Sequence, residues 1–456
     1  MPPSPTPDTS APITIRSLVR EAGSGGALIV FGGGLGFLAS ALMARWLGVE
    51  GFGIYSVWVT VAAMVAIAAK WGMDHAVYRY VSPRWNRGDR EEASALLRIL
   101  LRIVLVGSGL GAAAVLLGGW ALLGQPAVLA AMLVVPLAVA HFLEHAVHAT
   151  SSYRRALIPN KGIRPVGVLA ALAACFLFGV PGTPEWAVWI TVGGGLLASV
   201  LLYRMLQVRL PTPGPAFGPR RILSYGGQAC LFSLAVFFVD DVAILVLGAM
   251  GESGEAGIIA AANTLAGAQL VGWGVVGTVA ARSYAGAARD PRALQALHLR
   301  AGRMGALLTL STTAVIWALS PALLWVFDFP YGSVAVVLGL WTVGIVWATL
   351  FGYVQSLAVY TWRPLVVAAS ALACGALGVS FALALVGPLG PAAGAATGAL
   401  LGWMIHPAFL FWLLRRRVGI RWVFSAGWQA EMTAACREGA GAGAEILRAV
   451  RVRLRA

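Results

Sequence analysis

Two adjacent carboxylates, Asp240 and Asp241, lie within a long apolar run of the chain. A charged side chain near the centre of a membrane helix costs about 2.5 to 3.5 kcal/mol, so such residues usually face a protein interior or a water-filled path. Because neighbouring helix positions are about 100° apart, only one of the two is expected to face such a path fully. That carboxylate would line the path. The alternative is a protonated or salt-bridged pair with a structural role.

A second polar group, made of His141, Glu144, His145 and His148, follows a helical spacing in another apolar run. Residues three, four and seven positions apart share one face of a helix. We expect this face to line a passage through the membrane or its inner mouth, with ordinary interhelical hydrogen bonding as the alternative. The substring from His141 to His145 also matches the H-x-x-E-H pattern of a zinc-protease family. A membrane span gives that pattern no supporting context, so we predict neither a metal site nor catalysis there.

A third group, Lys70, Asp74, His75 and Arg79, closes the second apolar run. If that helix starts at Phe52, Lys70 lies about 27 Å along it, at the boundary of the hydrocarbon. The cations of this group would hold an anionic substrate through charge-assisted hydrogen bonds. A solvated helix end is the alternative.

The elements that position these groups are expected to be membrane helices. Apolar residues make up 59% of the 456 residues and charged residues 11%, whereas a soluble domain carries about 25% charge. Crossing ~30 Å of hydrocarbon takes about 20 residues, and the run lengths exclude a closed barrel. We therefore predict an all-α polytopic fold. Twelve uncharged runs mark its spans, at roughly 22–44, 52–69, 103–123, 127–143, 165–183, 186–203, 222–248, 256–281, 304–327, 331–360, 364–386 and 391–414.

The basic residues predict the orientation. Of the 33 Lys and Arg residues, only Arg45 falls on one side of the predicted spans, and all others fall on the opposite side. By the positive-inside rule both termini are cytoplasmic. Membrane topology thus accounts for the net charge of +15, and no nucleic-acid partner is predicted. The first apolar run is too long for a cleavable signal and is taken as a first span.

An internal repeat divides the spans into two halves. Residues 47–54 are echoed by 247–258, and Asp89 with its following residues by Asp290, at an offset near 200 in matching topological positions. Two parallel six-helix repeats with a substrate site between them are a common transporter plan. The tail is either a basic helix on the inner leaflet or a disordered end. The expected parts are 1–24, an N-terminal cytoplasmic segment; 25–208, the first lobe; 209–221, a linker; 222–417, the second lobe; and 418–456, the basic cytoplasmic tail.

Several stretches resemble bacterial polysaccharide flippases of the multidrug/oligosaccharidyl-lipid/polysaccharide exporter superfamily. Residues 44–48 (ARWLG), 51–56 (GFGIYS) and 71–80 (WGMDHAVYRY) are similar to the opening of those proteins. Asp241 with 245–248 (LVLG) and Gly257 resembles their seventh helix, and 387–396 (GPLGPAAGAA) their last outer hairpin. The chain departs from the pattern in its paired Asp240–Asp241, where a single Asp is expected, and at Ile259, where Tyr is usual.

The resemblance implies a V-shaped transporter, not an enzyme, in the bacterial inner membrane. It would move an undecaprenyl-diphosphate-linked oligosaccharide by alternating access, with membrane lipid and other polysaccharide-assembly proteins as further partners. Its implied coupling ion is Na⁺ or H⁺, bound by Asp240 or Asp241, with no other cofactor. The implied substrate-binding residues of the lumen and its inner mouth are Lys70, Asp74, Arg79, His141, Glu144 and His145.

Two other functions remain open from the sequence. A multidrug or organic-cation antiporter of the same superfamily would have an acidic, aromatic lumen without paired basic groups. A membrane glycan polymerase or glycosyltransferase would be an enzyme, but the predicted outer connections are short, which weighs against one. Neither Lys70 nor Lys161 follows a glycine, so a phosphate-binding G-x-x-x-x-G-K-[ST] loop is absent and ATP hydrolysis by that route is excluded.

Overall fold

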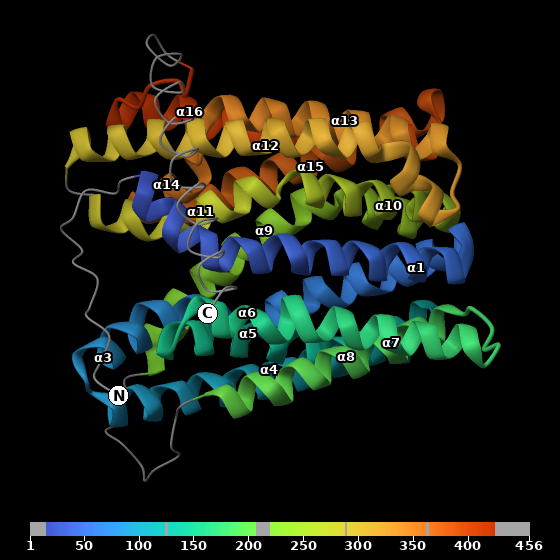
Figure 1. Cartoon of the computed structure of the whole chain (residues 1–456), viewed down its shortest axis with the longest axis horizontal. Helices are drawn as coiled ribbons and strands as arrows, with labels where there is room; N and C mark the ends of the chain where they lie inside the picture. Colours follow the sequence, from blue (N-terminus) through green and yellow to red (C-terminus); the bar gives the residue numbers. More distant parts are fainter. Residues whose placement is uncertain (1–14, 124–125, 207–218, 288–289, 362–363, 425–456) are drawn as a thin grey trace, which may run out of the picture.

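The computed structural model describes residues 15–123, 126–206, 219–287, 290–361 and 364–424 (Figure 1). These residues form helices and connecting turns, with no strand among them, so the all-α prediction is confirmed for this part of the chain. The helices of the first half are α1 (Ile15–Ala69), α2 (Met73–Ala76), the π-helix η1 (Val77–Val81), α3 (Ser82–Arg87), α4 (Arg90–Leu123), α5 (Pro126–Thr150), α6 (Tyr153–Leu157), the π-helix η2 (Ile158–Ile163), α7 (Arg164–Leu177) and α8 (Pro184–Met205).

The second half starts with a helix that directly follows the undescribed residues 207–218. Its helices are α9 (Pro219–Met250), α10 (Ser253–Gln269), α11 (Val271–Ala287), α12 (Pro291–Phe327), α13 (Tyr331–Phe351), α14 (Val354–Thr361), α15 (Pro364–Leu389) and α16 (Pro391–Val418).

Helix α1 contains two crossings of the membrane. Its 55 residues would extend about 80 Å as one straight helix, more than twice the hydrocarbon thickness. Gly48 breaks it, with φ 70° and ψ 176°, a conformation that glycine adopts readily because it has no Cβ. Figure 1 shows the two parts of α1 running side by side in opposite directions. The break falls where the sequence predicts the first outer turn.

The number of crossings agrees with the prediction. In the described chain, ten helices are long and apolar enough to span a membrane, or eleven when α10 and α11 count as one crossing. Taking the two parts of α1 separately then gives the predicted twelve. The span predicted over 256–281 is divided in the structure into α10 and α11, which meet at an angle of 52°.

The two halves of the chain form two groups of helices. In Figure 1, α4 to α8 lie on one side and α9 to α16 on the other, and α1 runs along the boundary between them. Buried apolar clusters fill each group, and a further cluster joins α1 to α9, α10 and α13. The residues assigned to the N-terminal segment and linker fall largely outside the described part, as does the tail beyond residue 424.

Glycines allow close packing along this boundary. A Cβ on Gly53 of α1 would overlap the carbonyl group of Ser253, and a Cβ on Gly257 of α10 would overlap the carbonyl oxygen of Val49. Small residues let membrane helices approach backbone to backbone. The end of the boundary next to the Gly48 turn is therefore closed by direct backbone packing.

Candidate functional site

The end of α1 turns sharply and brings a lysine back onto the first half. Trp71 has a φ of 50° and Gly72 a φ of 65°, so the chain leaves the helical direction before α2 begins at Met73. The turn places the ammonium of Lys70 2.8 Å from Oδ2 of Asp74 and 2.8 Å from Nδ1 of His141 on α5. Lys70 and Asp74 are 4% and 5% exposed. The structure thus joins three of the predicted substrate-binding residues in one network, in which Lys70 and Asp74 are buried and the His141 side chain is 53% exposed.

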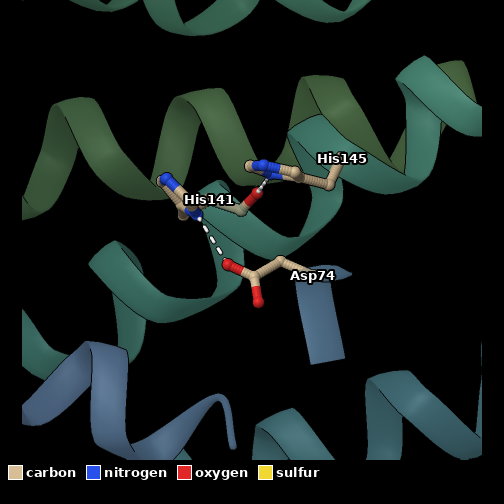
Figure 2. A group of neighbouring side chains, drawn as sticks. All are labelled: Asp74, His141 and His145. Atoms are coloured by element: carbon tan, nitrogen blue, oxygen red, sulfur yellow. Dashed lines mark hydrogen bonds and ion pairs between the residues drawn. The ribbon is translucent and has the colours of Figure 1, made fainter. Parts of the chain in front are cut away.

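The tautomers in this network follow from the donors. An ammonium can only donate, so Nδ1 of His141 accepts from Lys70 and the ring proton is on Nε2. His145 donates from Nδ1 to the carbonyl oxygen of His141 at 2.8 Å, which leaves its Nε2 as an acceptor. Figure 2 shows Asp74 beneath the two imidazoles, whose centroids are 4.6 Å apart.

The network has the donor set of a metal site but the geometry of an ion pair. The ligating atoms of Asp74, His141 and His145 lie within 4.8 Å of one another, a spacing that could surround a cation. However, the Lys70 ammonium already contacts Asp74 and His141. The Lys70 ammonium is therefore already bonded to the atoms of Asp74 and His141 that would ligate a metal ion.

Lys70 also determines the ionisation of Asp74. Burial alone would raise the pKa of Asp74, but the ammonium of Lys70, with the neighbouring histidines, holds that pKa well below its usual range. Asp74 is therefore ionised at any physiological pH. The network contributes no net charge, because the carboxylate balances the ammonium.

The remaining residues of this predicted group point elsewhere. Glu144 of α5 accepts a hydrogen bond from the side-chain amide of Asn160 in η2. Arg79 of η1 lies over the ring of Tyr225 on α9, 4.4 Å from its centroid. The structure therefore does not bring Arg79 together with Lys70, although the two are nine positions apart in the sequence.

The predicted ion-binding carboxylates lie on α9 in the second half. Asp240 accepts a hydrogen bond of 3.1 Å from the indole nitrogen of Trp403 on α16. Asp241 is half-buried. Within the described residues neither carboxylate has a cationic side chain at ion-pair distance, so the salt-bridged alternative finds no partner there.

A cavity of about 420 Å³ lies where α1, η2, α7 and α8 meet. Its polar lining includes Tyr55, Lys161, Arg164 and Thr191. The hydroxyl groups of Tyr55 and Thr191 are 2.7 Å apart. The sequence interpretation counted the two cations only as topological charges of a connection. Their spacing of three residues, which puts both on one helix face, was the available signal.

The first half also contacts the second half around the Trp71 turn. The indole nitrogen of Trp71 donates to the carbonyl oxygen of Leu223 on α9 at 3.0 Å, and Nε2 of His75 lies 3.2 Å from Oγ of Ser233. A Cβ on Gly72 would overlap the carbonyl oxygen of Gly226. The segment that carries Asp74 toward α5 thus also carries His75 toward the opposite half.

Comparison with known sequences identifies one family. The sequence profile of the family described as Polysaccharide biosynthesis protein matches residues 18–281. This match covers more than half of the chain and includes the Lys70 network, the cavity and both carboxylates of α9. No curated protein matches the chain in sequence.

Solved structures with a similar fold are transporters. An inward-facing multidrug-resistance MATE transporter of the MOP superfamily aligns with a TM-score of 0.62 at 18% identity, covering 85% of this chain and 94% of its own. The lipid II flippase MurJ in an inward closed conformation aligns with a TM-score of 0.61 at 13% identity, covering 86% and 87%. A Pyrococcus furiosus transporter of the MOP superfamily, described as having a binding pocket of reversed polarity, aligns with a TM-score of 0.59 at 15% identity, covering 91% of this chain and 99% of its own. The chain therefore has the fold of these transporters along most of its length.

Proposed function

Because the chain belongs to the polysaccharide biosynthesis protein family, we propose that it is a flippase for a lipid-linked oligosaccharide, which it carries across the bacterial inner membrane by alternating access. The observation that carries this proposal is that a chain of this family has a transporter fold along most of its length. Polysaccharides built on lipid carriers inside a cell need a step that moves the lipid-linked unit outward. A transporter fold supplies that step without bond-forming chemistry.

The lobe boundary supports the mechanism. At one end Gly53 and Gly257 pack backbone to backbone, and at the other Trp71 and His75 bond to α9. Alternating access would separate these two contacts in turn while the cavity beside α1 remains between them. Basic loops facing anionic lipid would place both termini in the cytoplasm. Other polysaccharide-assembly proteins would be its protein partners, and no nucleic-acid partner is proposed.

The carboxylates of α9 would couple transport to Na⁺ or H⁺. This role is supported by their place within a span and by the absence of a cationic partner among the described residues. The double substitution Asp240→Asn with Asp241→Asn is expected to abolish export of the glycan and leave membrane insertion intact. Asp328→Asn is the matched control, because Asp328 caps α12 with a φ of 62°, which Asn tolerates. Normal export in the double variant would remove the coupling.

A vesicle assay tests the proposal directly. Purified protein is reconstituted with a fluorescent, short-chain lipid-diphosphate oligosaccharide, and the fraction accessible to a membrane-impermeant glycosidase is followed over time. We expect protein-dependent access to the inner-leaflet pool. A wild-type protein that leaves this pool protected, in vesicles with an imposed ion gradient, would overturn the proposal.

The same preparation tests the two other functions. Gradient-driven export of an organic cation without movement of the glycan would indicate the multidrug antiporter, which the MATE-like fold and the acidic pair of α9 favour. Growth of the oligosaccharide in the presence of purified protein alone would indicate a polymerase.

A further inference from the structure

The cavity beside α1 carries positive charge that the described structure leaves unbalanced. Lys161 and Arg164 lie on its wall, and neither has a carboxylate at ion-pair distance among the described residues. Glu144 is an electrostatic neighbour of Arg164, and its carboxylate, which accepts a hydrogen bond from the Asn160 amide, offsets at most one of the two positive charges. Lys161 is exposed and Arg164 is partly buried. Because burying a charge costs several kcal/mol unless it is paired, the excess positive charge at Arg164 indicates an anionic ligand, with Lys161 as a second cation on the same wall.

The other walls of the cavity leave room for such a ligand and add neutral donors. The hydroxyl groups of Tyr55 and Thr191 face each other at 2.7 Å on the wall formed by α1 and α8. On α1, Gly36 contributes no side chain, and a Cβ built there would have no heavy atom within 4 Å. The volume of about 420 Å³ lies within the range of small-molecule pockets.

The charges belong to one lobe only. The second half contributes Gly267 and Val271 to the lining, at the bend between α10 and α11. Neither residue has a side chain that can bind an anion. A ligand bound to the two cations would therefore stay with the first lobe when the lobes separate.

We propose that this cavity binds the diphosphate of the substrate through Arg164 and Lys161, and that the first lobe alone carries the anion during transport. The guanidinium offers two parallel N–H donors to phosphate oxygens, and the ammonium adds a point charge. The glycan and the lipid chain extend beyond the cavity. This assignment rests on the proposed function for the identity of the substrate. The site for a phosphate-type dianion stands independently, with Lys70 excluded because Asp74 already balances its charge.

Binding is tested with farnesyl diphosphate as the probe and protein in nanodiscs of phosphatidylcholine. We expect Arg164→Gln and Lys161→Gln each to weaken binding about tenfold or more, since a charge-assisted hydrogen bond contributes about 1.5 to 3 kcal/mol. Arg164→Lys should retain part of the affinity. Arg154→Gln is the matched control, because Arg154 is an exposed cation of the same connection and does not line the cavity.

A second pair of variants tests the cavity without changing its charge. Gly36→Leu should fill the cavity and abolish binding of farnesyl diphosphate. Gly34→Leu is the control on the same helix, because its Cβ would also meet nothing within 4 Å while Gly34 lies outside the lining. Thermal unfolding in detergent confirms that each variant is folded.

The source of the phosphate is decided by competition. Nanodiscs with phosphatidylglycerol should reduce binding only slightly if the site selects a diphosphate. Complete loss of binding in those nanodiscs would show a site for bulk lipid headgroups and overturn the assignment. Equal affinity of wild type, Arg164→Gln and Gly36→Leu would also overturn it, even where the vesicle assay shows flipping. Arg164-dependent binding in a protein that moves no glycan would instead refute the proposed function and leave the anion site.

Discussion

Two groups of cations in the first lobe show opposite arrangements of the same charge. The Lys70 ammonium is buried, bonded to Asp74 and His141, and balanced. Lys161 and Arg164 line a cavity with no carboxylate at ion-pair distance in the described part of the chain. A cation in the interior of this membrane protein thus indicates a ligand only where the protein has not supplied the counter-charge itself. By this criterion Lys70 stabilises the fold, and Arg164 is available to bind.

The largest effect on stability is expected when the ion pair between Lys70 and Asp74 is broken. Asp74→Ala leaves the Lys70 ammonium buried without its partner, which should lower the free energy of unfolding by about 3 to 5 kcal/mol. Thermal or denaturant unfolding in detergent measures the change. The double variant Asp74→Ala with Lys70→Met removes both charges and should recover much of the loss. A double variant as unstable as the single one would show that the ion pair is not the cause.

A smaller loss of stability is expected when His141, whose imidazole accepts a hydrogen bond from Lys70, is replaced. His141→Phe keeps an aromatic ring and removes the acceptor of the 2.8 Å hydrogen bond, which should cost about 1.5 to 3 kcal/mol. The same unfolding measurement applies. His148→Phe is the control, because His148 is on the same helix and its Nδ1 bonds to the neutral hydroxyl of Tyr78 rather than to the Lys70 ammonium, so a smaller loss of about 0.5 to 1.5 kcal/mol is expected. Equal losses in both variants would contradict a specific role for His141.

The pH dependence of stability tests whether Asp74 is ionised in the folded protein. The pKa of Asp74 is lowered in the folded protein, so its stabilising effect is complete above the ordinary value of about 3.9 and is lost as the pH falls through the folded value. Wild type should therefore keep a constant advantage over Asp74→Asn between pH 5 and 8. Below about pH 4 that advantage should shrink by up to about 1.4 kcal/mol per pH unit. Unfolding curves across this range check the sign, and a gap that narrows between pH 8 and 5 would contradict it.

The smallest effect is expected at the unbalanced site. Arg164→Gln removes a cation that has no carboxylate at ion-pair distance in the described part of the chain, so the free energy of unfolding should change by only about 1 kcal/mol, while binding of farnesyl diphosphate falls. Unfolding without added ligand gives the measurement. A loss as large as that of Asp74→Ala would place Arg164 in the structural network and abolish the distinction between the two groups.

Much of the fold was predictable because membrane crossings leave long patterns in a sequence. The second predicted span ends at residue 69, where α1 ends at Ala69. The predicted spans that end at residue 386 and begin at residue 391 meet near the junction of α15 and α16, where Gly390 has a φ of 83°. The span predicted from residue 127 agrees within one residue with α5, which begins at Pro126. The bend near Leu270 was missed, because an uninterrupted apolar run carries no signal for direction.

The candidate site was only partly predictable, for a reason of tertiary structure. The sequence placed Lys70 and Asp74 together at the end of one apolar run, but the bond of Lys70 to His141 requires the turn at Trp71 and the packing of α5. The cavity depends on residues from four elements, and no local spacing reveals which of their faces remain uncovered. Lys161 and Arg164 therefore looked like any other basic residues of a cytoplasmic connection.

The placement of both unbalanced cations on one lobe has an electrical consequence. A bound dianion would offset the charges of Lys161 and Arg164 on the cavity wall, whereas in the empty lobe these two positive charges have no such ligand. Moving one elementary charge across the whole membrane changes its free energy by about 2.3 kcal/mol per 100 mV, and a charge that crosses part of the field experiences that fraction. The membrane potential would thus have little effect on the outward conformational change with substrate bound. It would favour the return of the empty transporter, because it draws the two cations toward the cytoplasm. Such a transporter would be reset by the membrane voltage.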